Sequence, residues 1–235
     1  CAVMDDATVS CLGDNDGGQL GDGTERERRE TGAVTGLSGA VDVEVAADYG
    51  EFACAVTSTE VQCWGGNQFR QLGDDVAVDA ACGDIDDERD CSLEPVTVMD
   101  LAPPEQLALG IDHGCARFDD GSVSCWGRNT SRQLGIDTTS PVATPTIVDA
   151  VGDVEELAAG GFHTCARLTD GSVECWGAND EGQLGDGSRD HGDSCGIGGT
   201  TGDCSVAPVY VALPGPAAIA IGAGRKHACA ALDNG

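Results

Sequence analysis

The sequence predicts an all-β repeat protein whose units have the size of propeller blades. One phrase returns four times: a cysteine, a short turn, a second cysteine, then Asn at plus four and Gln-Leu-Gly from plus eight. The units are spaced by about 57 residues on average, which suits a small antiparallel sheet that buries its apolar surface against its neighbours. The units start near Cys1, Cys54, Cys115, Cys165 and Cys229.

The two cysteines of each unit enclose a predicted β-hairpin. In residues 165–175, two short strands flank a three-residue loop at 169–171, where Gly171 supplies a positive φ. Such a loop places the two cysteines opposite each other, close enough for a disulfide. The second unit is one residue shorter, and a two-residue turn keeps its cysteines opposite. The expected hairpin disulfides are Cys1–Cys11, Cys54–Cys63, Cys115–Cys125 and Cys165–Cys175.

Two of the connections between units are longer than the others, and each contains a further cysteine pair. The pairs are Cys82 with Cys91 and Cys195 with Cys204. We expect two polar insertions, each closed by its own disulfide. A long polar loop makes few other contacts that could offset the conformational entropy lost when it becomes ordered. Closing a ring of this size contributes roughly 2.5 to 3 kcal/mol in the chain-entropy model. Since the insertions occupy equivalent places, they should project from one face.

The thirteenth cysteine, Cys229, has no predicted partner. The sequence stops at residues 233–235, which occupy the turn of the last hairpin. We therefore expect a single repeat domain, residues 1–235, that starts and ends inside a unit as a segment of a longer propeller. In a competing interpretation Cys1 is the lipidated first residue of a bacterial lipoprotein, which would leave Cys11 without a partner.

Paired cysteines at this density indicate an oxidising compartment, extracellular or at the cell surface. Structural zinc sites are the rival interpretation. They use Cys-x-x-Cys knuckles or added histidines, whereas these pairs are separated by nine or ten residues across hairpins. The thiols therefore predict disulfides and export.

The charge of the chain is strongly acidic. Its 41 Asp and Glu residues outnumber 12 Lys and Arg residues, for a formal net charge of −29. Such a surface repels phosphate backbones, so nucleic-acid binding is not expected. No stretch approaches the length of a membrane span. A protein partner, basic or cationic, fits this charge best.

Two stretches carry a resemblance to a known family. Residues 160–166, with the phrase Gly-Gly-Phe-His-Thr-Cys-Ala, and residues 170–185, with Cys-Trp-Gly-Ala-Asn and Gly-Gln-Leu-Gly, resemble the regulator of chromosome condensation repeat. More narrowly, they are similar to the cysteine-rich type found in exported bacterial proteins. The resemblance implies a β-propeller fragment of four blades plus part of a fifth, with four antiparallel strands per blade. Segments such as 208–211 and 219–221 would supply the remaining strands.

The family's activities transfer less directly than its fold. Its eukaryotic founder exchanges nucleotide on a small nuclear GTPase, and an exported bacterial relative inhibits β-lactamases. Both act by protein–protein contact on a propeller face, so the resemblance implies a protein-binding scaffold. A guanine-nucleotide exchange factor-like regulator and a calcium-stabilised structural surface module are the alternatives. No exchange-catalysing residue of the founder can be matched onto this sequence.

Repeated histidines and tryptophans are interpreted as packing residues. His113, His163 and His227 each lie two residues before a first cysteine, where the second unit has Phe52, which can neither bind a metal nor transfer a proton. Likewise, Leu12 stands in the first unit where three later units have tryptophan, which favours packing between units over a stacking platform. No nucleophile with a partnered base and no phosphate-binding loop emerges, so no enzyme is expected.

The acidic insertions are the candidate binding loops. Four alternating acids in the first insertion are weak calcium candidates, although the glycine of an EF-hand loop is missing; these are Asp84, Asp86, Glu88 and Asp90. Turn chemistry explains Asp14, Asp16 and Asp22 better than a metal does. No cofactor is otherwise expected. The residues expected to contact a partner are Asp84, Asp86, Asp87, Glu88, Asp90, Arg189, Asp190, His191, Asp193 and Asp203.

Overall fold

A computed structural model describes residues 1–46, 49–74, 80–82, 89–197 and 199–234. These residues form nineteen strands and no helix, as the sequence predicts. The strands are β1 (Ala2–Val3), β2 (Val9–Gly13), β3 (Arg28–Ala33), β4 (Ala40–Val45), β5 (Phe52–Thr57), β6 (Val61–Gly66), β7 (Ala80–Cys82), β8 (Arg89–Thr97), β9 (Gln106–Leu109), β10 (His113–Arg117), β11 (Val123–Gly127), β12 (Val142–Ile147), β13 (Val154–Ala159), β14 (His163–Leu168), β15 (Val173–Ala178), β16 (Asp193–Ile197), β17 (Thr200–Tyr210), β18 (Ala218–Gly224) and β19 (His227–Leu232).

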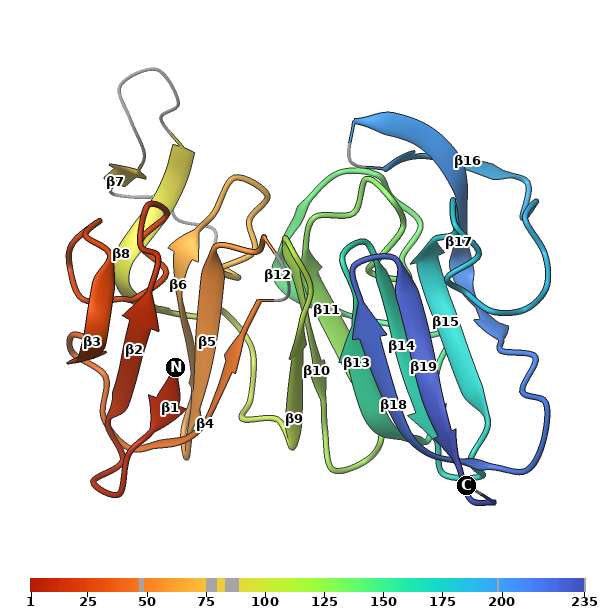
Figure 1. The fold of residues 1–235 in the computed structure, drawn as a ribbon, viewed down its shortest axis with the longest axis horizontal. Helices are drawn as coiled ribbons and strands as arrows, with labels where there is room; N and C mark the ends of the chain where they lie inside the picture. The colour runs from red at the N-terminus through yellow and green to blue at the C-terminus, as the bar shows by residue number, and fades with distance from the viewer. Residues whose placement is uncertain (47–48, 75–79, 83–88, 198, 235) are drawn as a thin grey trace.

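The strands form five antiparallel sheets that stand side by side in chain order (Figure 1). The third sheet has the plain four-stranded order β9-β10-β11-β12. The second and fourth sheets gain a fifth strand, with the orders β4-β5-β6-β8-β7 and β13-β14-β15-β17-β16. The first sheet holds β1-β2-β3, and the last holds β18-β19. Each complete sheet thus starts one strand before the first cysteine of its unit.

The strands expected at 208–211 and 219–221 are present, but they belong to neighbouring sheets. Pro208 lies in β17 of the fourth sheet, whereas Ile219 lies in β18, which begins the fifth. The sequence period and the sheet are therefore offset by one strand, because the strand before each first cysteine pairs with the cysteine hairpin that follows it.

All six expected disulfides are present in the structure. In the second, third and fourth sheets the two hairpin cysteines are direct cross-strand partners, as the turn lengths predict. Gly171 has the expected positive φ, at 80°, and Gly121 matches it at 77°. Cys229 is free and exposed.

The core lies between successive sheets and is centred on the repeated tryptophans. Trp64, Trp126 and Trp176 are completely buried. Each indole Nε1–H donates to the backbone carbonyl of the glutamine in the preceding unit, at 2.9 to 3.0 Å. The acceptors are Gln19, Gln71 and Gln133, in that order. One side chain therefore supplies both apolar burial and a hydrogen bond across each boundary between sheets.

We expect Trp126→Leu to destabilise the protein by about 3 kcal/mol, because it removes a buried ring and leaves the Gln71 carbonyl without its donor. Urea unfolding followed by circular dichroism measures this loss. Leu12→Ala is the matched control, since Leu12 holds the same repeat position but is 54% exposed. It should change stability by no more than about 0.5 kcal/mol. Equal losses in the two variants would contradict this account of the boundary.

Candidate binding face

The Asn and Gln of the repeated phrase build one rigid turn at the same end of each of the first four sheets. Asn179 Oδ1 accepts the Leu184 amide at 3.0 Å, and Gln183 Oε1 accepts the Glu181 amide at 2.8 Å. The same two bonds recur in the other three units. Short polar side chains that satisfy backbone groups locally fix such turns. The Asn-to-Gln spacing therefore encodes this turn.

The two disulfide-closed insertions form hairpins at this same end, as the sequence predicts (Figure 1). β7 pairs with β8, and β16 pairs with β17, each next to its disulfide. The third unit, which has no such insertion, lies between the two units that carry them. We call this end of the sheets, with its repeated turns and two hairpins, the hairpin face.

Each hairpin is fixed to the turn of its own unit by the same backbone bond. The Asn67 amide donates to the carbonyl of Asp90 in the first hairpin, and the Asn179 amide donates to the carbonyl of Asp203 in the second, both at 2.7 Å. Asn179 also donates its side-chain amide to the Asp203 carboxylate at 2.8 Å. The asparagine that closes the turn therefore also holds the base of the hairpin.

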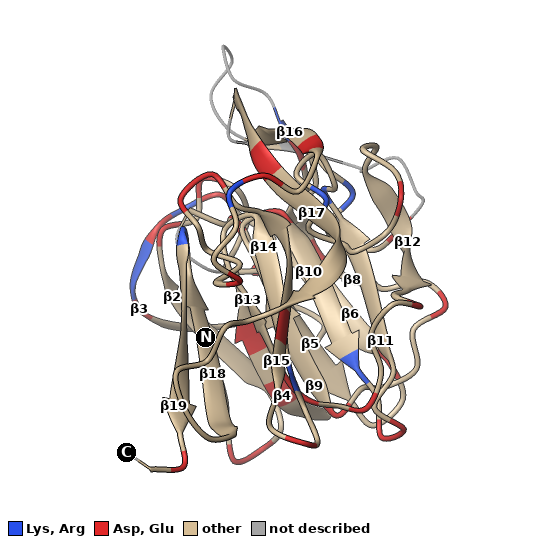
Figure 2. Cartoon of the chain, turned by 90° about the vertical axis from the view of Figure 1, so that its right-hand side faces the viewer, with Lys and Arg blue, Asp and Glu red and all other residues tan. Residues whose placement is uncertain are grey.

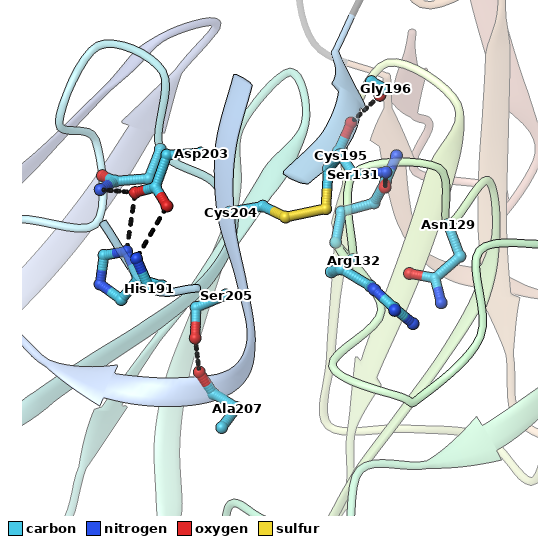
Figure 3. Close-up of a disulfide and its surroundings, with 12 residues drawn as sticks. Asn129, Ser131, Arg132, His191, Cys195, Gly196, Asp203, Cys204, Ser205 and Ala207 are labelled. Carbon is cyan, nitrogen blue, oxygen red and sulfur yellow. Dashed lines mark hydrogen bonds and ion pairs between the residues drawn. A yellow bond between two sulfur atoms is a disulfide. The ribbon is translucent and has the colours of Figure 1, made fainter. Parts of the chain in front are cut away.

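Each hairpin also contacts the turn of the preceding unit. The Gly23 amide donates to the carbonyl of Leu93 at 3.0 Å. On the other hairpin, the Gly196 amide donates to the Thr130 carbonyl at 3.1 Å, and the Ser131 hydroxyl donates to the Gly196 carbonyl at 2.7 Å (Figure 3). The hairpins are therefore tethered at two points each, to their own unit and to its predecessor.

His191 ties the second insertion together. Its Nδ1 lies 2.7 Å from Asp203 Oδ2 and its Nε2 lies 3.0 Å from Asp186 Oδ2. The ring is largely buried beside the disulfide Cys195–Cys204 (Figure 3). Burial lowers the pKa of His191, but the hydrogen bonds to the two carboxylates outweigh it and raise that pKa above its ordinary value.

The expected contact residues separate into two groups. Asp90, Arg189 and Asp190 are exposed, and Asp193 is half-buried, so these four side chains reach solvent. His191 and Asp203 instead bond each other inside the insertion and shape it. The expected residues Asp84, Asp86, Asp87 and Glu88 lie outside the described residues.

Sequence reasoning missed a cluster around Arg128 in the third unit. The Arg128 guanidinium lies 4.3 Å from the centre of the Phe69 ring and 5.0 Å from that of Phe162, and it bonds Asp112 Oδ2 at 2.9 Å. Burial raises the pKa of Asp112 more than the arginine lowers it. The residues come from three different units. Phe69, Arg128 and Phe162 each fall where the other units carry unrelated side chains, whereas Asp112 shares its repeat position with Glu51. No periodic signal could therefore have marked the cluster as a whole.

Two of the three repeated histidines, His113 and His163, are packing residues, as expected from Phe52, whereas His227 is exposed in this structure. His113 and His163 are completely buried, and His113 Nε2 lies 3.0 Å from the Thr164 hydroxyl. Burial, followed by the neighbouring His163, lowers the pKa of His113 to about 3; burial, followed by His227, lowers that of His163 to about 4. Both imidazoles are therefore neutral near pH 7.

Across residues 1–46, 49–74, 80–82, 89–197 and 199–234, no group of three His, Cys, Asp or Glu side chains is placed to hold a metal ion. Most of the acids proposed to bind calcium in the first insertion lie outside these ranges. Calcium binding there therefore stays a prediction. The described part of the chain also contains no helix of a length and hydropathy that would cross a membrane.

We expect protonation of His191 to control the order of the second insertion. Because the folded pKa is raised, this stabilisation is complete below the unfolded value of about 6.5 and is lost as pH rises through the folded value. Amide hydrogen exchange across residues 186–197, corrected for intrinsic rates, should show greater protection at pH 6 than at pH 9. His191→Gln should remove the difference. Equal protection at both pH values in the native protein would contradict this role.

Comparison with protein families matches the repeat directly. Two models described as the Regulator of chromosome condensation (RCC1) repeat match the chain. One matches residues 105–133 and 154–183, and the other matches residues 120–167 and 170–231.

Curated relatives share this repeat at moderate identity. The chain is 30% identical over 151 residues to the ultraviolet-B receptor UVR8 of Arabidopsis thaliana, which covers 63% of this chain and 32% of the receptor. It is 32% identical over 155 residues to the E3 ubiquitin-protein ligase HERC2 of Homo sapiens, which covers 63% of this chain and 3% of the ligase. The chain thus matches a third or less of either protein's length.

Solved structures agree on the fold. Prp20p from Saccharomyces cerevisiae superposes with a TM-score of 0.71 at 20% identity, over 95% of this chain and 51% of that one. Human WBSCR16 superposes with a TM-score of 0.74 at 20% identity, over 98% of this chain and 55% of that one. The chain therefore spans about half the length of these propellers. The repeat matches thus show that residues 105–231 consist of regulator of chromosome condensation repeats, and the solved structures show that the chain has a β-propeller fold.

Proposed function

We propose that the chain is a non-enzymatic protein-binding scaffold of the exported, cysteine-rich bacterial type, acting outside the cell or at its surface. The observation that carries this proposal is the hairpin face. Two insertions on a repeated frame stand at one end, and each is closed by a disulfide and tethered to two units. Loops that vary on a rigid repeated frame are where partner recognition usually resides.

Preorganisation makes the hairpin face suited to binding. A loop that is already ordered loses little conformational entropy when a partner docks. The second hairpin has three independent restraints, namely the disulfide Cys195–Cys204, the Gly196 bonds to the preceding turn and the His191–Asp203 pair. Its outward side chains therefore keep fixed positions without a partner.

Charge supports a basic or cationic protein partner. Acidic residues occur at both ends of the sheets and on the β16–β17 hairpin (Figure 2). Exposed carboxylates on the hairpins include Asp90 and Asp190. Prp20p, which shares the fold, has binding properties to Gsp1p and histones, and histones are basic proteins. An acidic face would steer such a partner into contact.

The thiols support the extracellular part of the proposal. Twelve of the thirteen cysteines form local disulfides, and such bonds persist in oxidising compartments. Each bond joins two cysteines of one hairpin. A reducing cytosol would remove restraints from every unit at once.

The proposal is tested with core histones as a basic probe protein. The triple variant Asp90→Asn, Asp190→Asn, Asp193→Asn removes three carboxylates from the two insertions. We expect about 10-fold weaker binding by isothermal titration calorimetry at 50 mM salt, with a smaller salt dependence, because exposed charges each contribute a fraction of a kcal/mol.

The matched control removes three exposed carboxylates at the opposite end, in Asp5→Asn, Asp119→Asn, Asp149→Asn. Both variants change the net charge equally, so only position differs. Equal weakening in the two would reject the hairpin face as the binding surface. Acceleration of nucleotide release from a small GTPase would favour the exchange-factor alternative. A melting temperature that rises with calcium and no saturable partner would favour the structural module.

A further inference from the structure

We propose that a small cavity on the hairpin face binds the N-terminal residue of a partner protein, an inference that rests on the proposed binding function. The cavity has a volume of about 110 Å³ and lies beside the first hairpin, where the first three units meet. Pockets for drug-sized ligands measure about 300 to 1,000 Å³, so this one suits a single small residue. Its walls include Gly17, Glu51, Gly66, Gln71, Asp90 and Asp112.

The cavity occupies the place that Arg128 fills one unit later. Gly66 stands at the repeat position of Arg128, three residues after the second cysteine. The residues around the Arg128 guanidinium are Asp112, Phe69 and Phe162. Their counterparts one unit earlier, in the same order, are Glu51, Gly17 and Asp112, and all three line the cavity. An arginine and two rings are therefore replaced by two glycines and a carboxylate, which leave an open, acidic space.

The two glycines keep this space open. A Cβ on Gly17 would come within 2.9 Å of Glu51 Oε2, so a side chain there would press on that carboxylate. A Cβ on Gly66 would lie 3.5 Å from Glu51 Cβ and 3.7 Å from Gln71 Nε2, at ordinary contact distance from two walls of the cavity. A larger residue at either position would therefore fill the cavity.

Gln71 directs an unused donor into the cavity. The residue is 3% exposed, and its Oε1 accepts a backbone amide of its own turn at 2.9 Å, which turns Nε2 toward the space beside Gly66. Among the described residues no group accepts a hydrogen bond from this nitrogen. The equivalent Gln183 Nε2 donates to Asp180 Oδ1 at 2.9 Å, and Gln133 Nε2, which also lacks an acceptor, is fully buried. The free Gln71 donor therefore predicts a ligand that brings an oxygen acceptor.

The cavity also carries an excess of negative charge. Both oxygens of Glu51 bond Arg89 Nη1 at 2.6 Å, and Asp112 Oδ2 bonds Arg128 at 2.9 Å. Asp90 adds a third carboxylate to the walls, so the charges of these described residues sum to −1. Burial raises the pKa of Asp112 and the nearby Glu51 raises it further, against the opposing effect of Arg128. A ligand with one positive charge would neutralise the cavity.

A peptide N-terminus combines the two required features in one small group. Its α-ammonium carries one positive charge and three N–H donors, which suit Asp90 and Asp112 Oδ1, an oxygen without a donor among the described residues. Its first carbonyl oxygen, close to the ammonium, accepts from Gln71. A lysine or arginine side chain has the charge but no acceptor, and a free amino acid has no net charge. Capture of an N-terminal amine is a known mode of peptide recognition.

The test is isothermal titration calorimetry of the native protein with the tripeptide Ala-Ala-Ala-amide at low salt. Two control ligands change one feature each: acetyl-Ala-Ala-Ala-amide lacks the ammonium, and acetyl-lysine-amide carries its ammonium on a side chain, far from any carbonyl. We expect the tripeptide to bind about 10-fold more tightly than either control, because it alone pairs both the carboxylates and the Gln71 donor. Equal affinity for either control ligand would overturn the proposal.

Gly66→Ala tests the position of the site. The added methyl group meets its neighbours at 3.5 Å or more, and glycine has no left-handed φ there, so the fold should be kept. We expect about 10-fold weaker tripeptide binding, because the methyl group stands in front of the Gln71 donor. Gly196→Ala on the second hairpin is the matched control, since its Cβ would meet nothing closer than 3.9 Å. Equal tripeptide affinity in the two variants would overturn the location.

Two further comparisons keep the result decisive. If Gly66→Ala melts well below the native protein, the three ligands on the unaltered chain still decide the question. Binding of core histones at the hairpin face without binding of the tripeptide would overturn this proposal and leave the proposed function in place.

Discussion

The hydrogen bond from each buried indole to the glutamine carbonyl of the preceding unit is the interaction on which the rest of the structure depends. It requires a turn that uses its Asn and Gln side chains internally and leaves one carbonyl directed at the next sheet. Because the same ring also fills the core between two sheets, it fixes both the relative position of the sheets and the packing between them. Without this link, the sheets would have only apolar contact to set their relative placement, and apolar contact is non-directional.

The hairpin face follows from that frame. The turn that receives the indole also carries the hairpins, since Asn67 and Asn179 bond to hairpin carbonyls at its start. Anchoring on the preceding turn, as between Gly196 and Thr130, then makes the face a shared product of neighbouring units. A face built in this way is rigid where the disulfides and turns meet, which suits it to the binding role proposed for it.

The repeat itself made most of the fold predictable. Turn length alone set Cys165 opposite Cys175, and replacement of tryptophan by Leu12 marked the ring as a packing residue. The offset between unit and sheet was not predictable in the same way, because a strand such as β18 carries no sign of which neighbour it pairs with. Contacts that occur once, such as Arg128 between two phenylalanines, leave no periodic trace. The bond between Asp203 and His191, which shapes the second insertion, also occurs once and leaves no periodic trace.

Each hairpin is locked by its own local disulfide, and this restraint holds the hairpin face in place. Peptide mapping of the folded protein without reduction, after alkylation of free thiols, is the measurement to make first. We expect six disulfides that each join cysteines nine or ten residues apart, with alkylation at Cys229 alone. Alkylation of the hairpin cysteines in a folded sample, or pairing between the two insertions, would contradict it.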